Sequence, residues 1–321
     1  MNNHERRKSA NKGLWIAIVF VVGLSVVSLF TGAYDIFNQP DGWEMFFITR
    51  VPRTVALMLS GSAMAMSGLV MQLLTQNRFV EPTTTGTIEW AGLGLLFVYL
   101  LVPAPSLILR MLGAIVFSFI GTMIFFLFIN RIRLRSSLIV PVVGMMMGAV
   151  VSAISSFLGL VFNMTQSIEG WFQGSFAGVE RGRYEFLWLV LVVAVLIYWY
   201  ANHLTIAGLG EEIATNLGLN HKRILLMGTV FVALVVGIVS AVIGNLPFLG
   251  IIVPNIVSMY RGDHLRENLV WVALLGMGTI LVSDIVSRTI IMPFEVPVSL
   301  ILGTLGAVVF IVILLKQRRQ I

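Results

Sequence analysis

The chain has no cysteine, and this absence restricts its chemistry before any motif is considered. Without thiols it can form neither a disulfide framework nor a thiolate metal site. Charge is scarce too, because Asp, Glu, Lys and Arg make up 11% of the 321 residues, whereas about 25% is usual in a soluble domain. Hydrophobic residues reach 58%. The composition therefore excludes an ordinary soluble domain and predicts an integral membrane protein.

Motifs for nucleotide and metal chemistry are absent as well. The sequence has no G-x-x-x-x-G-K-S/T loop to cradle phosphates and no H-E-x-x-H zinc helix. A buried Ser–His or zinc protease would need histidine inside the bundle, but the four histidines fall between the predicted spans. They are His4, His203, His221 and His264. A carrier or channel is favoured over an intramembrane enzyme, and we expect no cofactor and no resident metal.

Ten apolar segments are candidates for membrane spans, since a spanning helix needs about 20 apolar residues. They cover residues 14–32, 52–74, 86–102, 107–129, 137–161, 186–202, 224–243, 247–260, 269–288 and 298–315. The third and eighth are short and rich in Gly or Pro, and irregular backbone is tolerated in a membrane only under cover of protein or water. We expect these two to be central in an all-α membrane protein whose single transmembrane domain covers residues 1–321.

Lys and Arg gather in alternate connections between the spans. The tail 1–13, the connection 131–135, residues 222–223 and residues 316–319 are all basic. Because positive residues mark cytoplasmic loops, we expect an even number of spans and both termini in the cytoplasm. The net charge of +6 reports orientation here, and no nucleic-acid partner is expected.

The longest polar connection on the predicted cytoplasmic side covers residues 203–223. Glu211 and Glu212 lie early in a short predicted helix, where carboxylates favour the positive end of the helix dipole. Gly218 interrupts this helix, and Lys222 and Arg223 precede the next span. A solvated connection is one interpretation, but the length and helical character favour a docking surface for a partner in water.

Three arginines lie at the predicted outer rim, Arg50, Arg53 and Arg288. The guanidinium fork suits bidentate pairing with carboxylates of an external protein, and snorkelling to lipid phosphate is an equal alternative. Asp284 lies four residues before Arg288, and this spacing predicts a local ion pair.

Small residues recur every four positions in the predicted span 137–161. They are Gly144, Gly148, Ser152 and Ser156. Small residues let a neighbouring helix backbone approach closely. The spacing favours packing inside one subunit over a subunit interface or a face that lines a pathway.

Two irregular segments flank the short spans. Residues 77–86 are predicted to form a turn, because Pro82 disfavours helix at Glu81 and the following Thr run and Gly suit a capped restart. For Glu89, just inside the third predicted span, two roles are open: it faces a polar cavity, or it caps the helix and pairs with a neighbouring residue. Residues 245–255 contain two Pro and one Gly, which indicates a broken or re-entrant segment in the transport region.

Several of these motifs occur in one order along the chain. They are Arg50-Val51-Pro52-Arg53, the small-residue run 61–72, residues 77–94, Leu209-Gly210-Glu211-x-x-Ala214-x-x-Leu217-Gly218, Leu246 to Asn255 and Asp284-x-x-x-Arg288. In this order they resemble the FecCD-type permeases, the membrane subunits of ATP-driven importers for ferric siderophores, haem and vitamin B12. Arg78-Phe79, Glu89-Trp90 and Asn255 depart from the usual pattern and resemble the branch that imports catecholate siderophores such as petrobactin, enterobactin or anguibactin.

The resemblance implies a fold and a set of partners. The fold is a helical bundle like that of the vitamin B12 importer permease, with a cytoplasmic coupling helix. A cytoplasmic ABC ATPase would bind the coupling residues, which are Leu209, Gly210, Glu211, Glu212, Ala214, Leu217 and Gly218. An extracellular or periplasmic binding protein would dock on Arg50, Arg53 and Arg288. A second permease subunit, with a heterodimer favoured, would meet the face of Gly144, Gly148, Ser152 and Ser156 along the pathway.

The expected function is therefore ATP-driven import of an iron–siderophore complex, with no covalent chemistry in this chain. One alternative is an ABC permease for haem or vitamin B12. Another is an ion-coupled secondary transporter, which would want paired intramembrane carboxylates, and only Asp284 and Glu89 lie near membrane depth.

Overall fold

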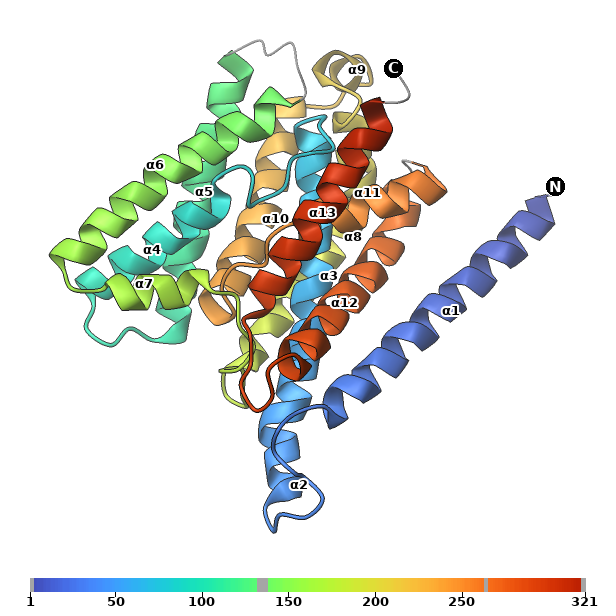
Figure 1. Ribbon diagram of the computed structural model, residues 1–321. Coiled ribbons are helices and arrows are strands. Elements are labelled where there is room, and N and C mark those ends of the chain that lie inside the picture. Colours follow the sequence, from blue (N-terminus) through green and yellow to red (C-terminus); the bar gives the residue numbers. More distant parts are fainter. Residues whose placement is uncertain (1–2, 132–137, 263–264, 319–321) are drawn as a thin grey trace.

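The computed structural model describes residues 3–131, 138–262 and 265–318, which form a bundle of helices (Figure 1). The longer helices are α1 (Asn3–Phe30), α3 (Val51–Leu74), α4 (Thr87–Leu101), α5 (Leu107–Arg131), α6 (Ile139–Val161), α8 (Trp188–Ala207), α10 (His221–Val242), α11 (Leu249–Arg261), α12 (Leu265–Thr289) and α13 (Val298–Arg318). The shorter ones are α2 (Gly42–Met45), the π-helical turn η1 (Phe46–Arg50), α7 (Thr165–Phe172), the 3₁₀ turn η2 (Tyr184–Leu187) and α9 (Glu211–Asn216). The predicted all-α class is confirmed.

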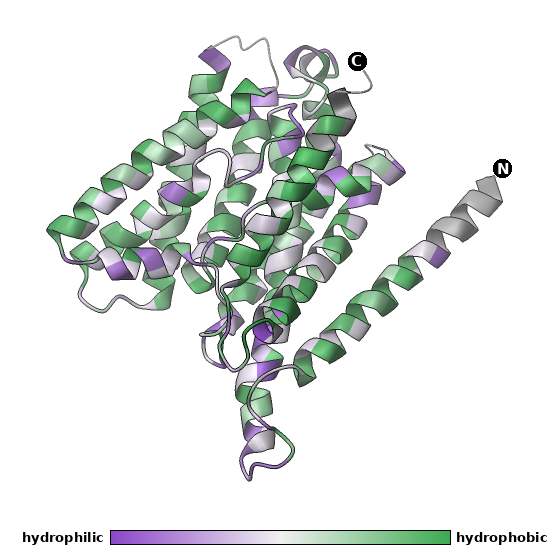
Figure 2. Ribbon diagram, in the orientation of Figure 1, coloured by the Kyte–Doolittle hydropathy of each residue, from purple (hydrophilic) through white to green (hydrophobic). Residues whose placement is uncertain are grey.

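Each predicted span coincides with one of the ten longer helices. Within the described residues, seven helical stretches are long and apolar enough to cross a membrane. Apolar residues make up most of the middle parts of the helices, while hydrophilic residues gather toward the helix ends and the connections (Figure 2). Residues 3–13, expected as a tail, continue α1 as helix. His264, residues 133 and 135 of the basic connection and residue 137 of the fifth predicted span lie outside the described residues.

Both ends of the chain lie at the same end of the bundle as α9, and α2 lies at the opposite end (Figure 1). We refer to these as the α9 end and the α2 end. The chain therefore traverses the length of the bundle an even number of times.

Helix α3 lies at the centre of the bundle, and most of its residues are buried. Glycines let it approach its neighbours at backbone distance. A Cβ at Gly61 would lie 2.8 Å from the carbonyl oxygen of Gly276 on α12, and a Cβ at Gly68 would overlap the backbone of Gly250 on α11. Close approach of this kind is how small residues pack membrane helices.

Helices α4 and α11 are too short to cross a membrane. They contain 15 and 13 residues, or about 22 and 20 Å at 1.5 Å per residue, against a hydrocarbon core of about 30 Å. The non-helical segments 75–86 and 243–248 precede them. The break in the helix predicted at 245–255 is therefore confirmed for residues 245–248. Residues 249–255 are helical, and Pro254 lies inside α11.

Candidate functional site

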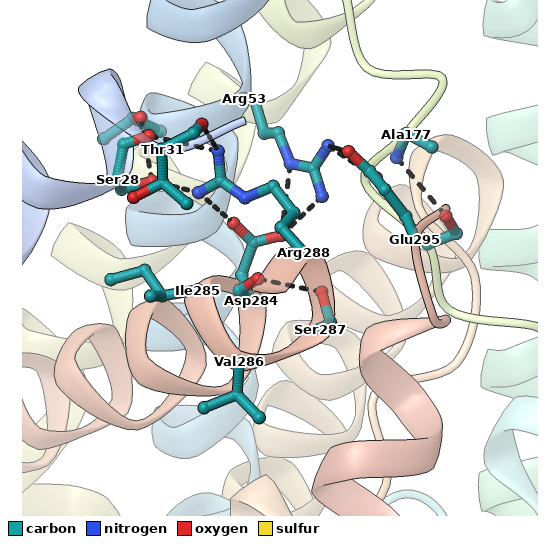
Figure 3. A network of polar contacts seen from close by, with 12 residues as sticks. Ser28, Thr31, Arg53, Ala177, Asp284, Ile285, Val286, Ser287, Arg288 and Glu295 are labelled. Carbon is teal, nitrogen blue, oxygen red and sulfur yellow. Dashed lines mark hydrogen bonds and ion pairs between the residues drawn. The ribbon is translucent and has the colours of Figure 1, made fainter. Parts of the chain in front are cut away.

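At the α2 end, four charged side chains from distant parts of the chain form one ion-pair cluster (Figure 3). Arg53 on α3 donates from Nη2 and Nε to Asp284 Oδ1 on α12, at 2.7 and 3.1 Å. Its Nη1 donates to both carboxylate oxygens of Glu295, at 2.9 and 2.8 Å. Arg288 Nη2 lies 2.5 Å from Asp284 Oδ2, so the ion pair predicted from the spacing of Asp284 and Arg288 is confirmed.

The cluster also holds α1. The Nη1 atom of Arg288 donates to the carbonyl oxygens of Ser28 and Thr31, at 3.1 and 2.6 Å, and its Nη2 atom donates to Ser28 Oγ at 2.8 Å. Arg50 donates to the carbonyl oxygens of Thr31 and Tyr34. The end of α1 is thereby fixed to α12 and to the start of α3.

The three arginines predicted as a docking surface differ in exposure. Arg50 is half-buried, whereas Arg53 is 9% and Arg288 2% exposed. Their guanidinium groups face Asp284 and Glu295 of the same chain, so their contact with an external protein stays a prediction. Glu295 was missed by the sequence reasoning because it lies in a connection, 242 residues from Arg53, with no local pattern to mark it.

A second polar contact network lies inside the bundle, where the segment 75–86 meets the start of α11. The buried carboxylate of Glu81 accepts from the backbone N–H groups of Phe248 and Gly250, each at 2.8 Å. The first N–H groups of a helix have no partner within the helix, and its N-terminus favours negative charge. Glu81 therefore caps α11. The predicted turn is confirmed, but this capping role was not foreseen.

Two amide side chains complete the contact between the segment 75–86 and α11. Asn255 Nδ2 donates to the carbonyl oxygens of Arg78 and Ile251, each at 2.8 Å. Pro254 has no N–H, so the carbonyl of Gly250 loses its helical donor. Gln72 Nε2 on α3 donates to that carbonyl instead, at 3.1 Å. Asn255 thus has a structural partner, and the proline is accommodated without a break in the helix.

The small-residue stripe divides into two parts. Gly144 packs against the backbone of Thr84 and Thr85, and a Cβ at Gly148 would lie 3.1 Å from Gly86 Cα and 3.2 Å from Glu89 Oε2. Both glycines therefore serve packing within the chain, as the spacing alone favoured. Ser152 is half-buried and Ser156 is exposed. Glu89 Oε2 is buried without a hydrogen-bond partner.

The short helix predicted in the connection 203–223 is confirmed as α9, and its role in coupling stays a prediction. Gly210 and Gly218 flank it with φ values of 113° and 79°, a left-handed backbone that favours glycine. Ala214 is buried and anchors the helix, whereas Leu209 and Leu217 are 58% and 60% exposed, with Ile213 beside them 45% exposed. We call Leu209, Ile213 and Leu217 the α9 apolar face. Exposed apolar residues on a polar connection indicate an interaction site.

A cleft of about 280 Å³ lies beside α9, between the ends of α3, α8, α11 and α12. Its lining includes Gln72, Gln76, Asn255, Asn268 and Leu209. In the described parts of the chain, no three His, Asp or Glu side chains are grouped closely enough to hold a metal ion. Besides amide and apolar side chains, the lining contains Arg78 and the hydroxyl groups of Thr205 and Ser258.

Comparisons with known proteins agree with this architecture. The model of the FecCD transport family matches residues 15–316. The chain is 69% identical to a petrobactin import system permease protein, FatD, of Bacillus anthracis, over 98% of this chain and 95% of that protein. It is 38% identical to the petrobactin import system permease protein YclN of Bacillus subtilis, over 94% of this chain and 97% of that protein.

A solved structure has the same fold. A chain described as an inward-facing conformation of a metal-chelate type ABC transporter superposes with a TM-score of 0.82 at 25% identity. The match covers 95% of this chain and 99% of that one. With this fold, and with a family match over nearly the whole length, the chain belongs to the FecCD transport family.

Proposed function

We propose that this chain is the permease subunit of an ATP-binding-cassette importer that carries an iron–siderophore complex across the bacterial cytoplasmic membrane. The observation that carries the proposal is the exposed α9 apolar face in a FecCD-family chain without a phosphate loop. Uphill transport by a bundle without a phosphate loop needs a separate energy source, and the α9 apolar face offers a surface on which an ATPase would bind. The chain itself performs no covalent chemistry.

The proposed cargo is a ferric siderophore of the catecholate type, with petrobactin as the first candidate. The 69% identical relative is named as a petrobactin permease, and so is the 38% identical one. Among the described residues no three His, Asp or Glu side chains are grouped to hold a metal ion, and an intact chelate that keeps its own iron ligands would need no such group.

The proposed ATPase site is the coupling segment around α9. Leu209 and Leu217 supply apolar contact area, and Glu211 and Glu212 add charge at the exposed start of the helix. Gly210, Ala214 and Gly218 set its shape and anchor it to the bundle. This assignment puts the α9 end and both termini in the cytoplasm, as the distribution of Lys and Arg also indicates.

The proposed docking site of the external binding protein is the α2 end. Arg50 is the most accessible of the three arginines, and Glu295, whose side chain is 33% exposed, covers Arg53. A carboxylate of the binding protein would reach Arg53 by replacing Glu295. Arg288 would act indirectly, because it positions Asp284 and α1.

The proposed second permease, in a heterodimer, meets α6. Ser156 is exposed on α6, and the same helix exposes large apolar side chains, among them Met146 and Phe157, each 65% exposed. Gly144 and Gly148 lie on the packed side of α6, where they allow close contact with α4 and the segment 75–86.

Transport in vesicles tests the proposal. The chain would be reconstituted with its ATPase and second permease, and uptake of ferric petrobactin from the loaded binding protein would be followed. We expect uptake that requires ATP hydrolysis and persists when ionophores dissipate ion gradients. Uptake driven by a gradient without ATP would establish the secondary transporter instead. Preferred uptake of haem or vitamin B12 would assign the cargo to one of the other family substrates.

The ion-pair cluster argues against ion coupling. A coupling carboxylate has to release and rebind its ion, but Asp284 is buried between two arginines. Glu81 is held as the cap of α11, so among the described residues the remaining candidate is Glu89, whose Oε2 is buried without a hydrogen-bond partner, and Glu89→Gln is the matched variant. ATP-driven uptake is expected to survive this change.

A further inference from the structure

A group of exposed aromatic side chains lies at the α2 end, on the segment 31–50 between α1 and α3. Phe37, Trp43 and Phe47 are 68%, 61% and 60% exposed. The Trp43 ring meets the rings of Phe37 and Phe46 edge to face, with ring centres 6.5 and 5.7 Å apart. The Phe47 ring packs on Phe46 at 5.4 Å. We call Phe37, Trp43 and Phe47 the α2 aromatic face. Large apolar side chains gathered on a surface indicate an interaction site.

The segment 31–50 holds this face in a defined shape. Ile36 and Phe46 are buried within the segment. A Cβ at Gly42 would overlap the carbonyl oxygen of Ile36, so the two sides of the turn touch at backbone distance. Arg50, at the base of the segment, donates to two backbone carbonyl oxygens near its start. A surface that is already shaped before binding loses little conformational freedom when a partner binds.

The α2 aromatic face extends beyond the lipid. The buried ion-pair cluster around Arg53 marks the outer edge of the hydrocarbon core, because charged groups are costly in its interior. Residues Gly42–Leu74 form one helical stretch, so at 1.5 Å per residue Phe47 and Trp43 lie about 9 and 15 Å beyond Arg53. The headgroup layer adds only about 5–7 Å on each side of the core. In Figure 1, α2 lies beyond the nearby ends of α1 and α12. The Trp43 side chain therefore stands in water.

Charge and position disfavour two other occupants of this face. Residues 31–49 contain Asp35, Asp41 and Glu44 but no Lys or Arg, so the segment is acidic and an anionic lipid surface would repel it. The proposed second permease meets α6, which lies on the opposite side of the bundle from α1 (Figure 1). The face is left open to a partner that approaches from the water at the α2 end.

We propose that the α2 aromatic face binds the external substrate-binding protein through an apolar patch that is rimmed by Lys and Arg. The inference rests on the proposed function, which puts the α2 end outside the cell. Arg50 and Arg53 would receive carboxylates of the binding protein, whereas the aromatic face with its acidic surroundings receives a basic-rimmed apolar patch. Two neighbouring contacts of opposite charge permit only one orientation of the binding protein. Exposed Trp side chains often carry a large share of the binding free energy of an interface.

Binding of the loaded binding protein to the importer in nanodiscs, assembled with its ATPase and second permease, tests this proposal. Trp43→Ala should weaken binding at least about tenfold, as for an interface residue that carries much of the affinity. The matched control is Trp199→Ala, since Trp199 is 74% exposed on the membrane-spanning helix α8 and should not affect binding. Unchanged binding by Trp43→Ala, or an equal loss in Trp199→Ala, would overturn the proposal.

Uptake separates this inference from the proposed function. In an active importer, Trp43→Ala should raise the concentration of loaded binding protein that gives half-maximal uptake about tenfold, with little change in the maximal rate. An unchanged half-maximal concentration, while the wild type imports the siderophore with ATP, would refute this inference alone. Capture of the binding protein by the wild type without ATP-driven uptake would refute the proposed function, and the loss of capture in Trp43→Ala would still support the aromatic contact.

A blocking test leaves the aromatic side chains in place. Gln39 is exposed between Phe37 and Trp43, and the cysteine-free background allows Gln39→Cys. A bulky maleimide attached there after assembly should prevent binding. The same label on Asn202→Cys, at an exposed position near the end of α8, should leave binding intact. Binding that survives the label at residue 39 would contradict the proposal. Quenching of Trp43 fluorescence by brominated lipid would also contradict it, because the face would then lie in the membrane.

Discussion

Neutralising Asp284 is expected to destabilise the bundle far more than neutralising Glu295. Asp284→Asn leaves Arg288 buried, 2% exposed, with only neutral acceptors, which are the oxygens of Ser28 and Thr31 and the new amide oxygen. Removing one partner of a buried ion pair costs about 3–5 kcal/mol. Glu295→Gln removes a pair whose acid is 33% exposed, and Arg53 keeps Asp284, so we expect about 1 kcal/mol or less after solvent screening.

Reversible unfolding in mixed detergent micelles measures both free energies of unfolding. The double variant Asp284→Asn with Arg288→Met should recover part of the stability lost in Asp284→Asn, because it removes the uncompensated buried charge. Equal losses for Asp284→Asn and Glu295→Gln would refute the reasoning. A double variant that is less stable than Asp284→Asn would show that Arg288 contributes mainly through its contacts with α1.

Three further changes test the other contacts. Glu81→Gln weakens charge-assisted hydrogen bonds to the start of α11, so we expect a loss of about 1.5–3 kcal/mol and faster hydrogen exchange at residues 248–251. Gly148→Leu would collide with Gly86 and Glu89 and is expected to lower the unfolding midpoint, whereas Ser156→Leu, on the exposed part of α6, should not. Leu217→Glu should weaken ATPase binding about tenfold, because about 1.5 kcal/mol of apolar contact is lost, while the thermal stability of the chain stays unchanged. Retained binding in a pull-down assay would contradict the α9 assignment.

Features that depend on local sequence were predictable. Apolar segments located the ten longer helices, and Gly218 marked the end of α9. The spacing of Asp284 and Arg288 gave their ion pair, because residues four apart in a helix are neighbours. Each of these patterns is contained within a few turns of chain.

Features that depend on distant contacts were not predictable. Glu81 lies 167 residues from Phe248, and nothing near either residue shows that they meet. The stripe from Gly144 to Ser156 divides into a packed part and an exposed part for a geometric reason. Steps of four residues in a helix of 3.6 residues per turn rotate the face by about 40° each, so Ser156 points about 120° away from Gly144 and leaves the packed face.

The contacts of Glu81 and Asn255 have a consequence for motion. They join the segment 75–86 to both the first turn and the middle of α11, and Gln72 adds a bond from α3. A hinge between these pieces would break several buried hydrogen bonds together. During a transport cycle α11 and the end of α3 are therefore expected to travel as one rigid body, and the rearrangement has to fall at boundaries without such bonds.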